Sequence, residues 1–184
     1  MHKVFISGSM AIKKISLDVL ARVDNIIESG YQVLVGDADG VDTSIQTYLL
    51  ERNAQSVLVY CAGNQPRNNI GDWPVNKIET KYSIGTRAYF TAKDLAMAED
   101  CDYGLMIWDA KSTGTLSNAI ELLKRKKSSL IFFNKEKLFV KIKSASDLEA
   151  IVSYMSEASI LKADKKMGLV SKIESLKNEQ SSLF

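Results

Sequence analysis

Short apolar runs rich in β-branched and aromatic residues alternate with segments whose apolar residues recur at helical spacing, and this alternation constrains the fold most strongly. Near-continuous apolar runs are typical of parallel strands that helices cover on both faces. The alternation therefore predicts an α/β protein with an open, doubly wound, mainly parallel sheet. We expect its strands at Val4–Ile6, Gln32–Val35, Ser56–Tyr60, Tyr103–Trp108 and Ser129–Phe133.

Helical stripes separate the expected strands. A first stripe runs from Ile15 to Ile27 and ends at Gly30, a residue type common at helix C-termini. A second surrounds Ile45, and a fourth includes Leu116 and Leu123. The third helix is expected to begin at Thr91, because Thr91-Ala92-Lys93-Asp94 has the form of a capping box.

The chain has 184 residues, which suits a single domain. We expect a core over residues 1–143, in which 139–142 add an edge strand, and a basic helical C-terminal extension over residues 144–184. Ser146 is expected to cap the first helix of this extension. A stripe with Leu169, Ile173 and Leu176 either packs on the domain or contacts a second copy, and we favour a homodimer through these C-terminal helices.

A long segment over residues 63–90 lacks periodicity and contains both prolines of the chain. Its aromatic residues indicate an ordered, functional loop rather than a disordered one. We expect Arg67 to bind a phosphate as a planar fork, and Asn68 to contact a base or sugar. Trp73 can stack on a base, but we favour packing that holds the loop down.

The single histidine, His2, lies in a terminus expected to fray, which argues against histidine-based triads and histidine metal sites. Cys61 and Cys101 form no Cys-x-x-Cys pair, which is typical of reduced thiols in a cytosolic protein. No apolar run is long enough to span a bilayer. We therefore expect a cytoplasmic protein with no membrane partner, metal or cofactor.

The charge is distributed unevenly around a net value of +2. Residues 121–184 carry 13 Lys or Arg and 8 Asp or Glu, so the first 120 residues are net negative. The few aromatic residues of this part do not alternate with its lysines in the way typical of nucleic-acid-binding segments, and no known nucleic-acid motif accompanies them. We interpret the lysines as a solvated helical surface and do not expect nucleic acid to be a partner, keeping it as a minor alternative.

Ligands of open α/β sheets bind beyond the carboxyl ends of the strands, and two turns of this sequence are expected there. In Ser7-Gly8-Ser9-Met10, Gly8 and Ser9 let backbone amides and a hydroxyl approach a phosphate or ribose. In the turn from Gly36 to Asp42, carboxylates beside glycines can bind ribose hydroxyls, while Asp42 is equally well placed as an N-cap. The residues of this second turn that we expect at the ligand are Gly36, Asp37, Gly40 and Asp42.

A third turn, Lys111 to Asn118, opens a helix with small hydroxyl residues and a glycine. The first amides of a helix are unpaired and its dipole is positive there, so the turn suits an anion; a simple capped helix start is the alternative. Neither Gly-x-Gly-x-x-Gly nor a P-loop is present. The expected ligand residues of this turn are Ser112, Gly114, Thr115 and Asn118.

Five segments of the chain follow one another in a characteristic order: VFISGSM, VGDADGVD, PRNN, KDLAMAEDCDYGLMIWD and STGTLSNAIELL. This ordered set resembles the SLOG superfamily of Rossmann-like proteins, most closely its YspA-like branch. The resemblance covers about residues 3 to 134. It implies a Rossmann-like fold that binds nucleotides or nucleotide derivatives such as NAD or ADP-ribose. LOG-type phosphoribohydrolases and, more distantly, nucleoside deoxyribosyltransferases are enzymes similar to this set.

Asn118 stands where those enzymes carry a glutamate at the N-glycosidic bond. An amide cannot act as a carboxylate nucleophile or base, so another carboxylate must take that task, and we prefer Asp39 and Asp109 as the candidate catalysts. The other possible substitutes are Asp94, Glu99, Asp100 and Glu121. We predict a protein that binds a nucleotide or nucleotide derivative, and leave open whether it hydrolyses or transfers at the N-glycosidic bond. A non-catalytic sensor of nucleotide derivatives is the alternative, and a nucleic-acid-associated protein that uses its basic tail is the second.

Overall fold

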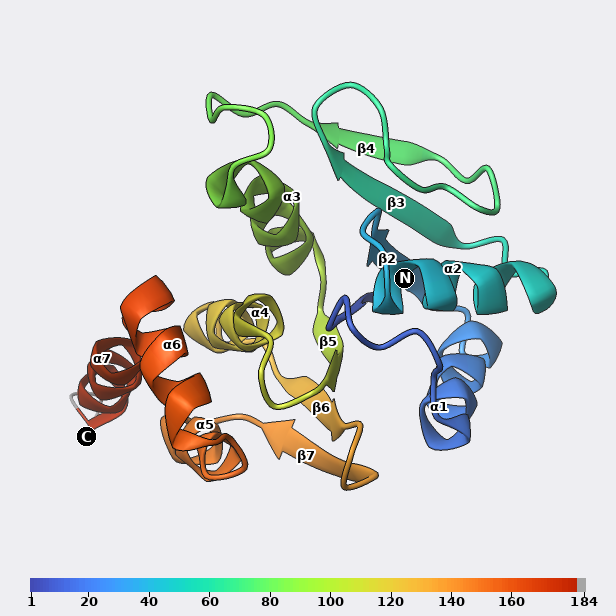
Figure 1. The fold of residues 1–184 in the computed structure, drawn as a ribbon. Coiled ribbons are helices and arrows are strands. Elements are labelled where there is room, and N and C mark those ends of the chain that lie inside the picture. The colour runs from blue at the N-terminus through green and yellow to red at the C-terminus, as the bar shows by residue number, and fades with distance from the viewer. Residues whose placement is uncertain (182–184) are drawn as a thin grey trace.

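The computed structural model describes residues 1–181, and within them a seven-stranded sheet forms the centre of the protein (Figure 1). The strand order is β4-β3-β2-β1-β5-β6-β7, and all neighbours are parallel except β6 and β7. This confirms the predicted doubly wound, mainly parallel α/β fold. The strands are β1 (Lys3–Gly8), β2 (Gln32–Gly36), β3 (Val57–Ala62), β4 (Val75–Ile78), β5 (Tyr103–Trp108), β6 (Ser129–Phe133) and β7 (Leu138–Ile142).

Helices cover both faces of the sheet (Figure 1). On one face lie α1 (Leu17–Glu28) and α2 (Val41–Glu51); on the other lie α3 (Arg87–Asp100), α4 (Thr113–Lys124), α5 (Ala145–Val152), α6 (Glu157–Met167) and α7 (Leu169–Ser181). Successive strand side chains point to opposite faces. Phe5 and Leu34 accordingly join the hydrophobic cluster under α3 and α4, while Ile6 and Val35 join the cluster under α1 and α2.

The C-terminal helices pack on the sheet and on α4 of the same chain. Leu169, Ile173 and Leu176 are buried in the cluster that contains Trp108. Our expectation that this stripe contacts a second copy is therefore wrong, because its apolar side chains are already covered. Gly168, with a φ of 63°, ends α6 and separates it from α7.

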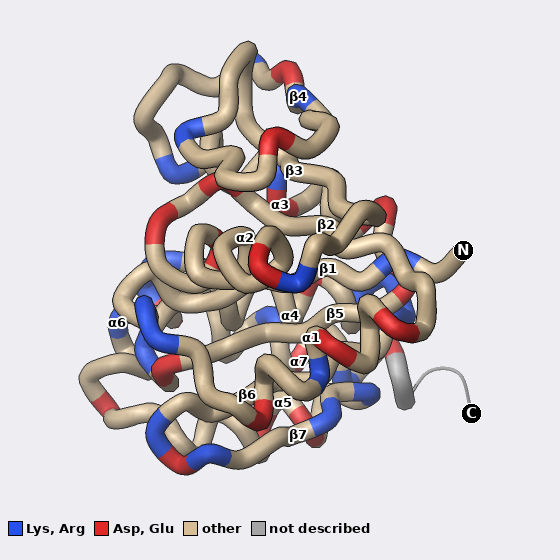
Figure 2. Tube along the Cα trace, turned by 90° about the vertical axis from the view of Figure 1, so that its right-hand side faces the viewer, with Lys and Arg blue, Asp and Glu red and all other residues tan. Residues whose placement is uncertain are grey.

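The loop over residues 63–90 is ordered by buried contacts and contains a strand that the sequence analysis did not predict, β4. Trp73 is 9% exposed and its indole N–H donates to the carbonyl of Ala54 at 3.0 Å, so it holds the loop onto the core. Helix α3 begins at Arg87 with Thr86 as its N-cap, not at Thr91. The N-cap of α5 is Ser144 and not Ser146, because Ser144 and Asp147 form a capping box. Among residues 1–181, no helix is both long and apolar enough to cross a membrane. Lys and Arg positions recur around β7 and α6 (Figure 2).

Candidate functional site

The direction in which the strands are added reverses between β1 and β5. The chain builds β2, β3 and β4 on one side of β1, then returns to place β5 on the other. Open α/β sheets bind ligands at this reversal, beyond the carboxyl ends of the strands. A cavity of about 320 Å³ lies there, lined by Ser7, Gly8, Met10, Ala38, Asp42, Arg67, Phe90, Lys93, Asp94, Ser112, Gly114, Thr115 and Asn118.

Glycines of the first two turns allow the chain to pack closely around this cavity. A Cβ at Gly8 would lie 2.3 Å from the carbonyl oxygen of Ile107. Gly40 caps α2 with φ 81° and ψ −122°, a conformation that favours glycine, and a Cβ there would lie 2.3 Å from the carbonyl oxygen of Met10. A Cβ at Gly36 would meet the Asp42 carboxylate at 2.3 Å. At each of these three predicted positions, therefore, a side chain larger than that of glycine would clash with a neighbouring atom.

The N-terminus of α4 faces the cavity. Ser112 is its N-cap, and the Ser112 side chain accepts a hydrogen bond from the Thr115 N–H. This is the capped helix start that the sequence offered as an alternative. Gly114 has open space beside it: a Cβ there would meet only the Ser112 Oγ, at 3.9 Å. Asn118, one turn further on, is buried and its Nδ2 donates to the Ser7 Oγ at 3.0 Å. The third predicted turn therefore lies beside the first.

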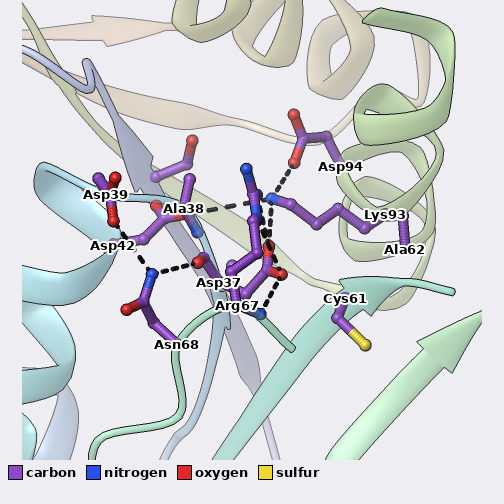
Figure 3. A network of polar contacts seen from close by, with 12 residues as sticks. Asp37, Ala38, Asp39, Asp42, Cys61, Ala62, Arg67, Asn68, Lys93 and Asp94 are labelled. Carbon is purple, nitrogen blue, oxygen red and sulfur yellow. Dashed lines mark hydrogen bonds and ion pairs between the residues drawn. The ribbon is translucent and has the colours of Figure 1, made fainter. Parts of the chain in front are cut away.

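Lys93, which the sequence analysis did not select, is the central cation of the site (Figure 3). It is 4% exposed, and its Nζ lies 2.8 Å from the Asp94 carboxylate, 3.8 Å from Asp42 and 3.9 Å from Asp37. Burial acts to lower the pKa of Lys93, but these carboxylates raise it above its ordinary value. A signal was present in the sequence, because Lys93 precedes the buried Met97 by one helical turn.

Asp42 is buried beside this lysine and does not cap α2, where Gly40 is the N-cap. Its carboxylate accepts the Ala38 N–H at 3.1 Å. Burial raises the pKa of Asp42 to about 6, and the Lys93 charge opposes that rise. The N-cap alternative is therefore wrong, and the carboxylate belongs to the site.

Arg67 is held by Asp37 rather than standing free for a phosphate. Its Nε and Nη2 donate to the two carboxylate oxygens of Asp37 at 3.2 and 2.7 Å, and its backbone N–H donates to the same carboxylate at 3.0 Å. These hydrogen bonds keep the pKa of Asp37 below its ordinary value although burial acts to raise it. The guanidinium also lies 4.4 Å from the centre of the Phe90 ring. Arg67 and Phe90 together form one wall of the cavity.

The two candidate catalysts lie outside the lining of the cavity. Asp39 is exposed and accepts a hydrogen bond from Asn68, whose Nδ2 also donates to the Asp37 carbonyl. Asp109 accepts the N–H groups of Lys111 and Ser112 at 2.9 and 2.7 Å, so its carboxylate orders the turn into α4. The backbone N–H of Asp109 donates to Ser9 Oγ at 3.2 Å, so the Ser9 side chain also helps to order the turn into α4. The carboxylates that line the cavity are those of Asp42 and Asp94.

Comparison with protein-family models finds no match, and comparison with curated proteins finds none. Among solved structures, DNA processing protein A from Helicobacter pylori is similar, with a TM-score of 0.55 and 19% sequence identity over 71% of this chain. The chain spans 64% of the length of that protein's chain. This likeness supports the Rossmann-like fold; SLOG membership stays a prediction.

The comparison corrects one expectation about partners. The similar structure concerns the single-stranded DNA binding mode of its protein, so a fold of this kind serves nucleic-acid binding. Our expectation from the charge pattern that nucleic acid is not a partner is therefore wrong.

Proposed function

We propose that the cavity between the carboxyl ends of β1, β2 and β5 binds a nucleotide or nucleotide derivative, with a phosphate at the N-terminus of α4. The observation that carries this proposal is the open space at Gly114, beside the first turn of α4 and within the cavity. Unpaired amides and the positive end of the helix dipole favour an anion at such a position. The cavity volume of about 320 Å³ is at the lower end of small-molecule sites.

The remaining groups of the cavity suit the other parts of a nucleotide. The carboxylates of Asp42 and Asp94 can accept hydrogen bonds from ribose hydroxyls. Both carboxylates are held in place by ion pairs with the Lys93 ammonium. The Phe90 ring offers a surface for a base. Arg67 contacts the Phe90 ring and donates a hydrogen bond to the Asp37 carboxylate, so it links the two. We propose that it supports the ring in this way rather than making the direct phosphate contact expected from the sequence.

We propose binding without cleavage of the N-glycosidic bond. Asn118 carries no carboxylate, and its amide is engaged by Ser7. The two carboxylates of the cavity are both paired with the Lys93 ammonium, whose Nζ lies 3.8 Å from Asp42 and 2.8 Å from Asp94, so neither stands free to attack an anomeric carbon. Incubation with nucleoside monophosphates, NAD and ADP-ribose followed by chromatography should release no base; release that is lost in Asp94→Asn would overturn this part of the proposal.

Calorimetry on two variants of one residue tests the binding site. Gly114→Asp places a carboxylate where the phosphate is proposed to lie, and a like charge at about 4 Å weakens binding by about 100-fold or more. Gly114→Ala is the matched control, because its methyl group meets only Ser112 Oγ at 3.9 Å and should leave affinity nearly unchanged. Equal affinity of Gly114→Asp and the native protein for AMP, NAD or ADP-ribose, in a folded variant, would refute the site.

A second candidate function is the binding of single-stranded nucleic acid. The similarity to a protein whose structure concerns single-stranded DNA binding favours it. Fluorescence anisotropy with a labelled oligonucleotide tests this candidate, and binding should weaken as salt increases because released counterions drive it. Absence of binding at low salt would reject the second candidate and leave the nucleotide site untouched.

A further inference from the structure

The amino-terminal edge of the sheet, opposite the cavity, carries two adjoining hollows. Strands β1, β5 and β6 begin at this edge and the antiparallel β7 ends there, so residues distant in sequence meet. One hollow of about 440 Å³ and another of about 340 Å³ share Tyr103 and Ser128. We name as the Tyr103 edge the residues Arg22, Tyr103, Lys126, Lys127, Lys141 and Lys143, all of which line these hollows.

The charge of the Tyr103 edge is strongly positive. Asp102 is the one carboxylate in the lining of the two hollows, which both lie within residues 1–181, and it already accepts the Lys3 N–H at 2.8 Å and lies 3.4 Å from His2 Nδ1. The neighbouring carboxylates are also engaged, since Glu99 pairs with Arg125 and Asp147 closes a capping box with Ser144. The five cations of the edge therefore face few free acidic groups.

Four of these cations reach the solvent, and among them the Arg22 guanidinium also lies 5.4 Å from the centre of the Phe139 ring. Arg22, Lys126, Lys141 and Lys143 are exposed. Lys127 is partly buried, and its ammonium donates to the carbonyl oxygens of Ala98 and Glu99 at the end of α3, which gives it a structural task.

Three aromatic rings that are distant from these lysines in the sequence, those of His2, Tyr31 and Tyr103, lie beside the cations. Tyr103 is 42% exposed. The His2 ring lies 5.6 Å from the Tyr103 ring and 5.2 Å from the Tyr31 ring, measured between centroids. The expectation of a frayed terminus at His2 is therefore wrong. The fold supplies the interleaving of basic and aromatic residues whose absence from the sequence had argued against nucleic acid.

We propose that the Tyr103 edge binds single-stranded nucleic acid, with phosphates on the exposed cations and a base stacked on Tyr103. An alternation of charge and base faces is the chemistry of a single strand, whereas a duplex keeps its base faces stacked inside. The proposal gives the second candidate function a location, on the opposite side of the sheet from the nucleotide cavity. It does not depend on what the cavity binds.

Two variants separate the charge and stacking parts of the interaction. Lys126→Gln/Lys143→Gln removes two phosphate contacts, which should lower the slope of log affinity against log salt by about 1.4 and weaken binding by about 25-fold at 0.1 M salt. Tyr103→Ala should weaken binding by about tenfold or more while leaving that slope unchanged. The matched controls are Lys162→Gln/Lys166→Gln on α6 and Tyr82→Ala, all of them exposed residues outside the edge.

Fluorescence anisotropy of the full chain with 12-nucleotide single-stranded DNA, single-stranded RNA and duplex DNA provides the readout. We expect both single strands to bind more tightly than the duplex, the edge variants to weaken binding and the controls to leave it unchanged. Equal losses in the control variants, preference for the duplex, or full affinity in both edge variants would each overturn the proposal. If native protein binds single strands and only Gly114→Asp weakens binding, the strand uses the cavity instead and the Tyr103 edge is refuted. If native protein binds no oligonucleotide, both the edge and the second candidate function fail, while calorimetry still decides the nucleotide site.

Discussion

Replacing Lys93 by methionine should destabilise the protein by about 4 kcal/mol at pH 8. The ammonium lies 3.8 Å from the buried Asp42 carboxylate, and unit charges at that distance interact by about 4 kcal/mol at an effective dielectric constant of 20. Removal of one partner of a buried ion pair typically costs about 3–5 kcal/mol, because the other charge stays buried and uncompensated. Methionine keeps the length and apolar stem of lysine, so the packing of α3 on the sheet is retained.

The loss should depend on pH in a defined direction. Burial already raises the folded-state pKa of Asp42 from 3.8 to about 6, and loss of the Lys93 charge raises it further. A carboxyl whose pKa is higher in the folded state binds its proton more tightly there, so the folded state gains stability as pH falls through that pKa. The destabilisation by Lys93→Met should therefore be largest above pH 7 and smaller at pH 5, where Asp42 of the variant is protonated.

Urea unfolding at pH 5 and pH 8, followed by fluorescence of the buried Trp73 and Trp108, measures both effects. The native protein at each pH is the reference, so the titration of groups far from Lys93 cancels. Asp42→Asn in the Lys93→Met background should recover part of the loss at pH 8, because a neutral amide replaces the uncompensated charge. A loss below about 1 kcal/mol, or one of equal size at both pH values, would refute the ion-pair argument.

Two further variants test the loops around the site. Gly40→Ala should destabilise the protein by more than about 1–3 kcal/mol, since it adds a clash with the Met10 carbonyl to the strain of a positive φ; chemical denaturation showing a change below that range would contradict the steric role of this glycine. Trp73→Phe should cost about 1–3 kcal/mol, because the buried Ala54 carbonyl loses its donor, and should speed proteolytic cleavage within residues 63–90; an unchanged cleavage rate would show that Trp73 does not hold the loop.

Much of the fold could be predicted from the sequence because its strands are fully covered. Strands such as β5 and β6 are apolar on both faces, and their runs stand out between helical stripes. β4 could not be found this way, since it is a four-residue edge strand, Val75–Ile78, with polar residues at its centre. The start of α3 was misplaced because Thr86, its real cap, lies in a loop without periodicity, while Thr91 only has the spacing of a cap.

The site could be predicted as far as it consists of turns at strand ends. Gly8 and Gly114 line the cavity and Gly36 lies against Asp42, which lines it, because the carboxyl ends of parallel strands share one edge of the sheet. Side-chain partners across the sheet could not be predicted, since they depend on how α3 sits over β2. The sequence therefore does not point to Lys93. For the same reason it suggests that Asp37 and Arg67 each contact a ligand, whereas in the structure they form an ion pair with each other.

A nuclear magnetic resonance titration of the labelled protein with ADP-ribose, AMP and NAD tests the central claim most directly. We expect at least one of these ligands to shift backbone amide signals at Gly8 and Ser9 and along residues 113–118, at the N-terminus of α4. Signals at residues 126–128 and at Tyr103, on the opposite edge of the sheet, should stay unchanged. Shifts confined to that opposite edge, or no shifts with any of the three at millimolar concentration, would show that the cavity does not bind a nucleotide.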